Sequence, residues 1–151
     1  MENGISESEG VLEAIWIKRA KRGPMDPAPS ARLLAGSGIE GNADQGGWRQ
    51  VTVIARESWD RMMSVLDTQV DPSARRANLL VRGIDLREAR GRVLHVGTCR
   101  IEVRGETRPC ERMDEAYAGL RAVMRADWNG GVFGVILDDG EIRIGDPVRL
   151  V

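Results

Sequence analysis

The sequence has few cysteine, histidine and aromatic residues. Its 151 residues include two cysteines, Cys99 and Cys110, one histidine, His95, and only 4% aromatic residues. A tetrahedral structural zinc site needs four cysteine or histidine ligands, and two cysteines do not form a disulfide framework in a chain this long. These shortages exclude a structural zinc domain and a disulfide-stapled secreted domain. We therefore expect a reduced, cytoplasmic protein.

Long apolar runs and an excess of one charge are also missing. No stretch approaches the roughly 18 apolar residues that span a bilayer. The acidic, polar start of the chain has no apolar segment typical of a secretory signal. The 22 basic and 23 acidic residues give a net charge of -1, which argues against a broad surface for nucleic acid or anionic membrane. We expect neither kind of partner, so any anion site must be local.

The length is sufficient for one domain with a full hydrophobic core. We expect a flexible N-terminal tail over residues 1–10 and a single domain over residues 11–151, because no change in composition marks a second domain. Apolar residues at helical spacing predict one helix over residues 57–66 and a longer one over residues 112–125.

Short runs of β-forming residues predict about seven strands. Residues 97–98 are expected to form either a hairpin turn or a bend within one long strand. A parallel α/β fold would need a helix after nearly every strand, so this order favours a mainly β, mixed barrel-like sheet with inserted helices. The expected strands are residues 11–18, 50–54, 78–81, 92–96, 99–103, 132–137, 142–144 and 148–151, and the proline-rich residues 22–29 are expected to be an irregular loop.

Five glycines within residues 36–47 predict a loop whose backbone takes positive φ angles. Residues 36–41 match GxGxxG, but more glycine follows where a dinucleotide site needs a helix, so we do not expect a nicotinamide nucleotide. Backbone N–H groups of such a loop can still hold an anion, with Arg49 at its end. A surface loop without a ligand explains the pattern equally well.

The two cysteines differ in their surroundings. Cys99 lies in an alternating strand pattern and is expected to be inert and buried. Cys110 lies between Arg108 and Arg112 just before the longer predicted helix, where positive charge favours a thiolate that can act as nucleophile or metal ligand. Glu111 has the opposite effect, and an ordinary cysteine at a helix start explains the position too.

The only histidine, His95, lies in a strand pattern and is expected to be structural rather than a base for Cys110. Chemistry at Cys110 would then depend on electrostatics or on a bound cofactor.

Several short motifs occur together in a recognisable order. They are the opening strand with its basic, proline-rich loop, residues 38–42, 49–54, 75–86, 91–97, 109–110 and 131–148. Over roughly residues 11–151, the chain resembles the MOSC family, named for the C-terminal domain of molybdenum cofactor sulfurase. The resemblance implies a compact β-barrel and a role around the molybdenum cofactor (molybdopterin), a pterin dithiolene that bears a phosphate.

The resemblance also implies site residues. One cysteine of the family carries sulfur as a persulfide or binds molybdenum, and Cys110 matches that position, as catalytic residue and metal ligand. Arg49 and Arg76 would offer charge-assisted hydrogen bonds, and Asn78 an amide for the pterin edge. The full set of implied cofactor-binding residues is Gly41, Asn42, Arg49, Gln50, Arg76, Asn78 and Arg112.

The sequence departs from the family pattern in several places. Many members have aspartate at the position of Asn42, a histidine nearby, and glutamate at the position of Ala77, so roles that depend on those residues do not transfer. We also find no aminotransferase-like portion that binds pyridoxal phosphate, as in the full sulfurase, and no iron–sulfur ligand set. A separate reductase or cysteine desulfurase is therefore expected to supply electrons or sulfur.

Three functions stay open at this point. The leading expectation is a stand-alone protein that binds the molybdenum cofactor and reduces a small N-oxygenated substrate at a molybdenum ligated by Cys110. One alternative is a persulfide sulfur carrier for the maturation of metal–sulfur cofactors. The other is a non-catalytic binding module of the same fold, so enzyme activity itself is undecided.

Overall fold

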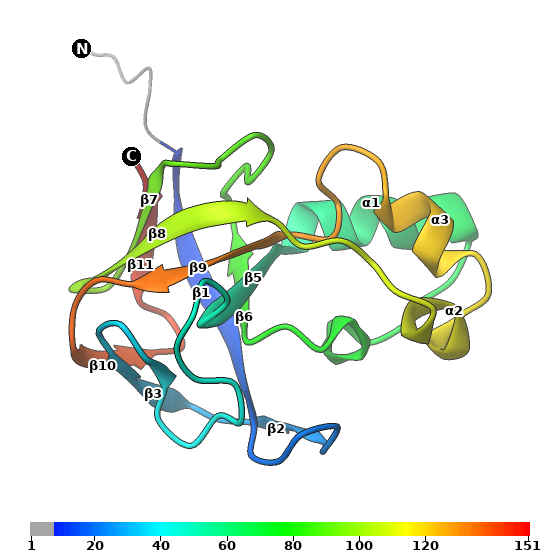
Figure 1. Cartoon of the computed structure of the whole chain (residues 1–151). Helices are drawn as coiled ribbons and strands as arrows, with labels where there is room; N and C mark the ends of the chain where they lie inside the picture. The colour runs from blue at the N-terminus through cyan, green and yellow to red at the C-terminus, as the bar shows by residue number, and fades with distance from the viewer. Residues whose placement is uncertain (1–7) are drawn as a thin grey trace, which may run out of the picture.

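Seven strands close into a barrel in the computed structural model, which describes residues 8–151 (Figure 1). The ring returns to its first strand because β1 pairs with both β6 and β11. β5 and β6 run parallel, and the other neighbouring pairs of the ring are antiparallel, which confirms the expected mixed barrel. In ring order the strands are β1 (Ser8–Lys18), β11 (Pro147–Leu150), β7 (Val93–Val96), β8 (Cys99–Glu106), β9 (Val132–Ile136), β5 (Val51–Ala55) and β6 (Leu79–Arg82).

Successive side chains point to opposite faces along the strands, so that the aliphatic side chains on one face point into the barrel and fill it. Leu12, Leu79 and Leu94 are fully buried, and β8 alternates between buried and more exposed residues along its whole length. Each buried leucine contributes roughly 1.5–3 kcal/mol of hydrophobic stabilisation. β7 and β8 form a hairpin, which settles the two interpretations of residues 97–98.

Three short strands were not predicted from the sequence. β2 (Met25–Pro27) lies within the segment expected to be an irregular loop and pairs antiparallel with the end of β1. β3 (Ser30–Leu34) pairs with β10 (Gly140–Arg143) and with β4 (Gly38–Ile39) in a separate small sheet. Strands of two to five residues contain too few alternations of buried and exposed positions to show in a sequence. The buried residues of the small sheet join the barrel core.

The glycine loop has the backbone that its composition predicted. All five glycines of residues 36–47 have positive φ, between 67° and 156°. The segment opens into β4 and turns rather than into a helix, so the helix N-terminus that a dinucleotide site requires is missing from these residues.

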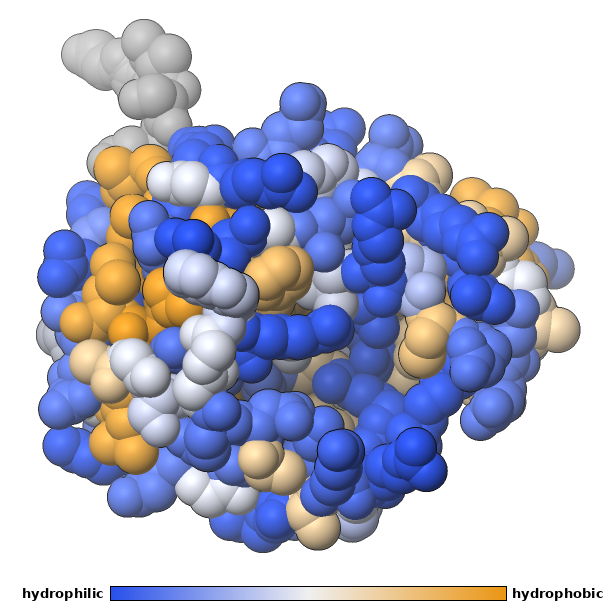
Figure 2. Space-filling model, in the orientation of Figure 1, coloured by the Kyte–Doolittle hydropathy of each residue, from blue (hydrophilic) through white to orange (hydrophobic). Residues whose placement is uncertain are grey.

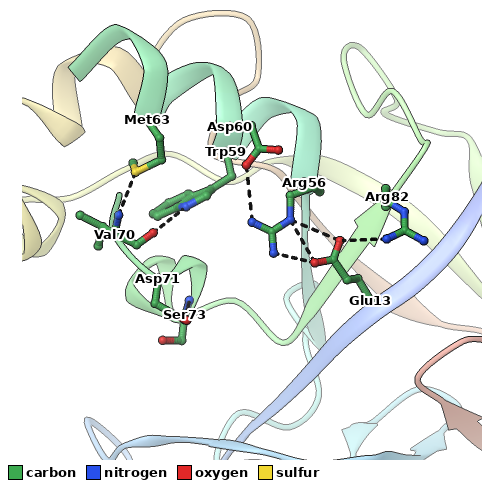
Figure 3. Close-up of polar contacts among 9 residues, drawn as sticks. All are labelled: Glu13, Arg56, Trp59, Asp60, Met63, Val70, Asp71, Ser73 and Arg82. Atoms are coloured by element: carbon green, nitrogen blue, oxygen red, sulfur yellow. Dashed lines mark hydrogen bonds and ion pairs between the residues drawn. The ribbon is translucent and has the colours of Figure 1, made fainter. Parts of the chain in front are cut away.

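A helical layer packs on one side of the barrel (Figure 1). Helix α1 (Arg56–Leu66) confirms the first predicted helix and buries Trp59, Met62 and Met63. Figure 3 shows the Trp59 indole N–H donating to the carbonyl of Val70 at 2.9 Å, which ties the chain after α1 back onto the helix. A short 3-10 helix, η1 (Pro72–Arg75), follows. Within residues 8–151, no helix has both the length and the apolar character needed to cross a membrane.

The second predicted helix, residues 112–125, is wrong as a single element. The structure has two helices, α2 (Arg112–Ala116) and α3 (Leu120–Met124), separated by Tyr117 in an extended conformation and Gly119 at φ 93°. Met113, Leu120 and Met124 all face the same apolar cluster, so the helical spacing of apolar residues continues across the break.

The expected tail over residues 1–10 is also too long. Residues 1–7 lie outside the described part of the chain, whereas Ser8, Glu9 and Gly10 belong to β1 and pair with β11.

Candidate functional site

A polar cavity of about 550 Å³ opens at the side of the barrel, where the glycine loop, β1 and the start of β6 meet. Figure 2 shows a hollow between the barrel and the helical layer, bordered largely by hydrophilic residues. Three of the predicted cofactor-binding residues, Arg49, Arg76 and Asn78, line the cavity. The remaining lining residues are Lys18, Met25, Ala43, Asp44, Gln45, Gly46 and Thr52.

Positive charge predominates in this cavity. Lys18 is paired with Asp44, with 2.8 Å between Nζ and Oδ2. Arg76 donates from Nη2 to the carbonyl of Gly23 at 2.6 Å, and the Arg49 guanidinium lies 5.8 Å from the centre of the Phe133 ring. Across residues 8–151, no carboxylate forms an ion pair with Arg49 or Arg76. Two guanidinium groups are therefore available to an anion.

Asn78 has a structural role that the resemblance did not indicate. Its Oδ1 accepts from the backbone N–H and the hydroxyl of Thr52, at 3.1 and 3.2 Å. Its Nδ2 donates to the carbonyl of Trp16 and to Oδ1 of Asn42, both at 3.2 Å. Asn42 Oδ1 also accepts from the backbone N–H of Lys18 at 2.8 Å. All four hydrogen-bonding positions of the Asn78 amide are used inside the protein, so that amide is not free for a pterin edge.

Gln50 and Gly41 shape the glycine loop and do not line the cavity. Gln50 is buried; its Oε1 accepts from Ile136 N–H and its Nε2 donates to the carbonyl of Gly47, both at 2.9 Å. Gly41 has φ 86°, and a Cβ there would lie 3.0 Å from Arg19 Nη1. Contact of these residues with a cofactor stays a prediction, while the hydrogen bonds of Gln50 hold the loop against the barrel.

Cys110 is an exposed free thiol on the segment between β8 and α2. Its carbonyl accepts from the backbone N–H of Met113 at 3.0 Å. Because α2 is only five residues long, the helix dipole expected to favour a thiolate is weak. Arg112 is exposed and lowers the pKa of Arg76 electrostatically, secondary to burial. Arg112 therefore belongs to the positive region around the cavity without lining it.

Arg75 is a site residue that the sequence did not single out. Its guanidinium is buried, with only 7% of the residue exposed. Burial, and secondarily the charge of Arg49, lower the pKa of Arg75 to about 10. Arg75 also contacts Thr107 and Met113, which flank Cys110 in the chain, and it directly precedes the cavity residue Arg76. The sequence shows two adjacent arginines, and nothing in their pattern tells which one is buried.

Cys99 and His95 lie elsewhere. Cys99 is 0% exposed inside the barrel, where burial raises the pKa of its thiol, so the expectation of an inert core cysteine is confirmed. His95 lies on β7, opposite Arg100 and Arg149 on the neighbouring strands. In the described part of the chain, no group of three or more His, Cys, Asp or Glu residues could hold a metal ion. A metal at Cys110 would need its other ligands from a cofactor.

Solved structures of low sequence identity share the fold. The YuaD protein from Bacillus subtilis matches with a TM-score of 0.81 and 18% identity, covering 96% of this chain and 97% of that chain. YiiM from Escherichia coli matches with a TM-score of 0.68 and 18% identity, covering 93% of this chain and 69% of that chain. YiiM from Geobacillus stearothermophilus matches with a TM-score of 0.69 and 16% identity, covering 93% of this chain and 73% of that chain.

No curated protein matches the sequence at a significant level. The pattern of the MOSC domain matches residues 40–149, which is more than half of the chain. This segment includes Arg49, Arg76 and Cys110, and the barrel agrees with the fold that the resemblance implied. The chain therefore belongs to the MOSC domain family.

Proposed function

We propose that this protein binds the molybdenum cofactor with Cys110 as the protein ligand of molybdenum, and that it reduces a small N-oxygenated substrate with electrons from a separate reductase. The observation that carries the proposal is an exposed thiol near a polar cavity: Arg76 lines the cavity, and its neighbour Arg75 bonds to both sides of the segment that carries Cys110. The two cavity arginines have no carboxylate partner within residues 8–151. The MOSC family is associated with this cofactor, which supports the choice of ligand.

The residues at the site suit such a group in size and charge. A cavity of about 550 Å³ lies within the usual range for small-molecule sites. Arg49 and Arg76 would bind the phosphate, since guanidinium groups form paired hydrogen bonds with phosphate oxygens. A thiolate is a soft ligand suited to a metal in a sulfur-rich sphere. The bound cofactor would supply the two-electron chemistry of the reduction.

The remaining polar residues would hold this arrangement rigid. The hydrogen bonds of Asn78 with Trp16, Thr52 and Asn42 fix β1, β5 and the glycine loop to one another. Gln50 ties the end of that loop to β9. A site built on such a network keeps its geometry without rearrangement when a ligand enters.

Metal and pterin analysis of the purified protein tests the proposal. Protein made in a host with the complete cofactor pathway should contain molybdenum in near-stoichiometric amount. Cys110→Ala should lose the metal, and the matched control Cys99→Ala should retain it, because Cys99 is sealed in the barrel. Wild-type protein free of molybdenum under these conditions would contradict the proposal.

A second candidate is a persulfide carrier, favoured by the exposure of Cys110 beside a buried Cys99. The Cys110 thiolate would attack the outer sulfur of a desulfurase persulfide, and the desulfurase thiolate would leave, so no net oxidation occurs. Mass spectrometry should then find one added sulfur atom on Cys110 and none on Cys99. An unlabelled Cys110 argues against the carrier, and full cellular function of Cys110→Ala would instead favour the non-catalytic module.

A further inference from the structure

Arg75 holds together three parts of the chain around Cys110. Its Nε donates to the carbonyl of Gly130 at 3.0 Å, and its Nη2 donates to the carbonyl of Thr107 at 3.3 Å. Its Nη1 lies 3.8 Å from Sδ of Met113. Thr107 and Met113 each lie three residues from Cys110, on either side. The guanidinium therefore fixes both ends of the segment that carries the thiol.

The packing around this guanidinium leaves little freedom. A Cβ at Gly130 would collide with the carbonyl of Thr107 and would lie 3.4 Å from Arg75 Nη2. The backbone N–H of Thr107 also donates to the carbonyl of Gly131 at 2.9 Å. The segment before Cys110 is thus held against the turn at residues 130–131 both by backbone pairing and by Arg75.

The charge of Arg75 has no acidic partner among residues 8–151. A buried guanidinium that meets only carbonyls and a thioether is electrostatically unfavourable. If Arg75 served only to join these loops, a neutral donor would do so without that penalty. The retained charge therefore points toward a negative group close by, and Cys110 lies midway between Thr107 and Met113, the two residues of this segment that the guanidinium contacts.

We propose that Arg75 is a positioning residue that clamps the Thr107–Met113 segment and places an uncompensated positive charge beside Cys110, so that anionic reactants are favoured at this thiol. The inference rests on the proposed function only in taking Cys110 as the reacting group. Its subject is this chain's own residues, and it requires no bound cofactor.

Competing alkylation tests the proposal. Cys110 is exposed and Cys99 is buried, so Cys110 can be modified selectively by anionic iodoacetate and by neutral iodoacetamide at one pH. Both reagents react with the same thiolate, so the fraction of thiolate drops out of the ratio of the two rates. The ratio therefore reports the electrostatic potential at the sulfur. In Arg75→Met and Arg75→Gln this ratio should fall by about two- to fourfold, and Arg75→Lys should restore most of it. The full-length chain is made in a host unable to synthesise the cofactor.

The control is Arg56→Met, because Arg56 is a partly buried arginine whose charge is compensated by an ion pair with Glu13 at 2.6 Å (Figure 3). Its ratio should equal that of the wild type. A merely structural role of Arg75 would change both alkylation rates together and leave their ratio unchanged. That result in a folded Arg75→Gln variant would overturn the proposal, as would a wild-type ratio insensitive to salt. Failure to bind molybdenum would not alter this ratio, so the two proposals fail separately.

Discussion

The barrel and the helical layer are stabilised in different ways. The barrel buries mostly Leu, Ile and Val within a closed ring of backbone hydrogen bonds. The helical layer buries four methionines with Trp59 and Leu120, and two of its helices have only five residues. Methionine fills irregular space and adapts to change more readily than branched side chains. The barrel and the glycine loop beside it thus carry Asn78 and most of the cavity wall, whereas the adaptable part carries Cys110.

The comparison explains why the candidate site lies where these parts meet. Arg76 follows η1 with a left-handed backbone at φ 63° and lines the cavity. Its neighbour Arg75 is buried and contacts Thr107 and Met113 on either side of Cys110. The two adjacent arginines therefore serve the two regions. A substitution in the barrel should destabilise the whole molecule, and one in the helical layer should act mainly on the presentation of Cys110.

The largest effect is expected in the barrel core. Leu79→Ala should lower the free energy of unfolding by about 2–5 kcal/mol, because it removes a fully buried side chain and leaves a cavity. Urea denaturation followed by circular dichroism measures the change. Val65→Ala is the control, since Val65 is exposed on α1 and should change stability by no more than about 0.5 kcal/mol. Equal effects of both would contradict a rigid barrel.

The same difference is expected between two asparagine side chains, Asn78 at the barrel and Asn129 in the helical layer. Asn78→Ala should destabilise the protein by about 2–4 kcal/mol, because it leaves buried groups of Thr52, Trp16 and Asn42 without this partner. Asn129→Ala, in the helical layer, removes one bond to the carbonyl of Val123 and also a buried Oδ1 that has no partner among residues 8–151. Its effect should be about 1 kcal/mol or less. If urea denaturation showed a larger loss of unfolding free energy for Asn129→Ala than for Asn78→Ala, the account would be contradicted.

An effect smaller than that of Asn78→Ala, and one that depends on pH, is expected at Asp71, which caps η1 through a bond from the backbone N–H of Ser73 at 2.9 Å (Figure 3). Hydrogen bonds from Ser73 lower the pKa of Asp71 below its ordinary value of 3.8. The ionised carboxylate therefore stabilises the fold above pH 3.8, and this contribution is lost as the pH falls through the lowered pKa. Asp71→Ala should cost about 1 kcal/mol at pH 7.

Thermal unfolding of both proteins between pH 2 and pH 7 checks this prediction. The difference in stability between wild type and Asp71→Ala should be constant at neutral pH and should shrink at acidic pH. A difference that grows as the pH falls would show that the carboxylate does not act as the cap.

Sequence patterns predicted the barrel better than the helical layer. Alternation of buried and exposed residues in long strands such as β8 follows directly from pleated geometry. The break between α2 and α3 did not show, because Met113, Leu120 and Met124 keep helical spacing across an extended Tyr117. β4 was not predicted, because a strand of two residues is too short to show an alternation of apolar and polar positions.

The candidate site was predictable only in part, for a related reason. Residue types near glycine loops and cysteines indicate chemistry, and on this basis Arg49, Arg76 and Asn78 were expected near one another and do line one cavity. Sequence position does not reveal whether a polar side chain faces a cavity or a backbone. The amides of Asn78 and Gln50 are engaged within the protein, and the burial of Arg75 depends on contacts with residues 107, 113 and 130 that only the fold brings together.

The molybdenum-to-protein ratio of wild type, Arg76→Met and Cys110→Ala, purified in parallel from a host that makes the cofactor, tests the central claim most directly. We predict a ratio near one for the wild type, a reduced ratio for Arg76→Met because one phosphate contact is lost, and almost no metal in Cys110→Ala. A wild type without molybdenum, or a Cys110→Ala variant that retains it fully, would contradict the account.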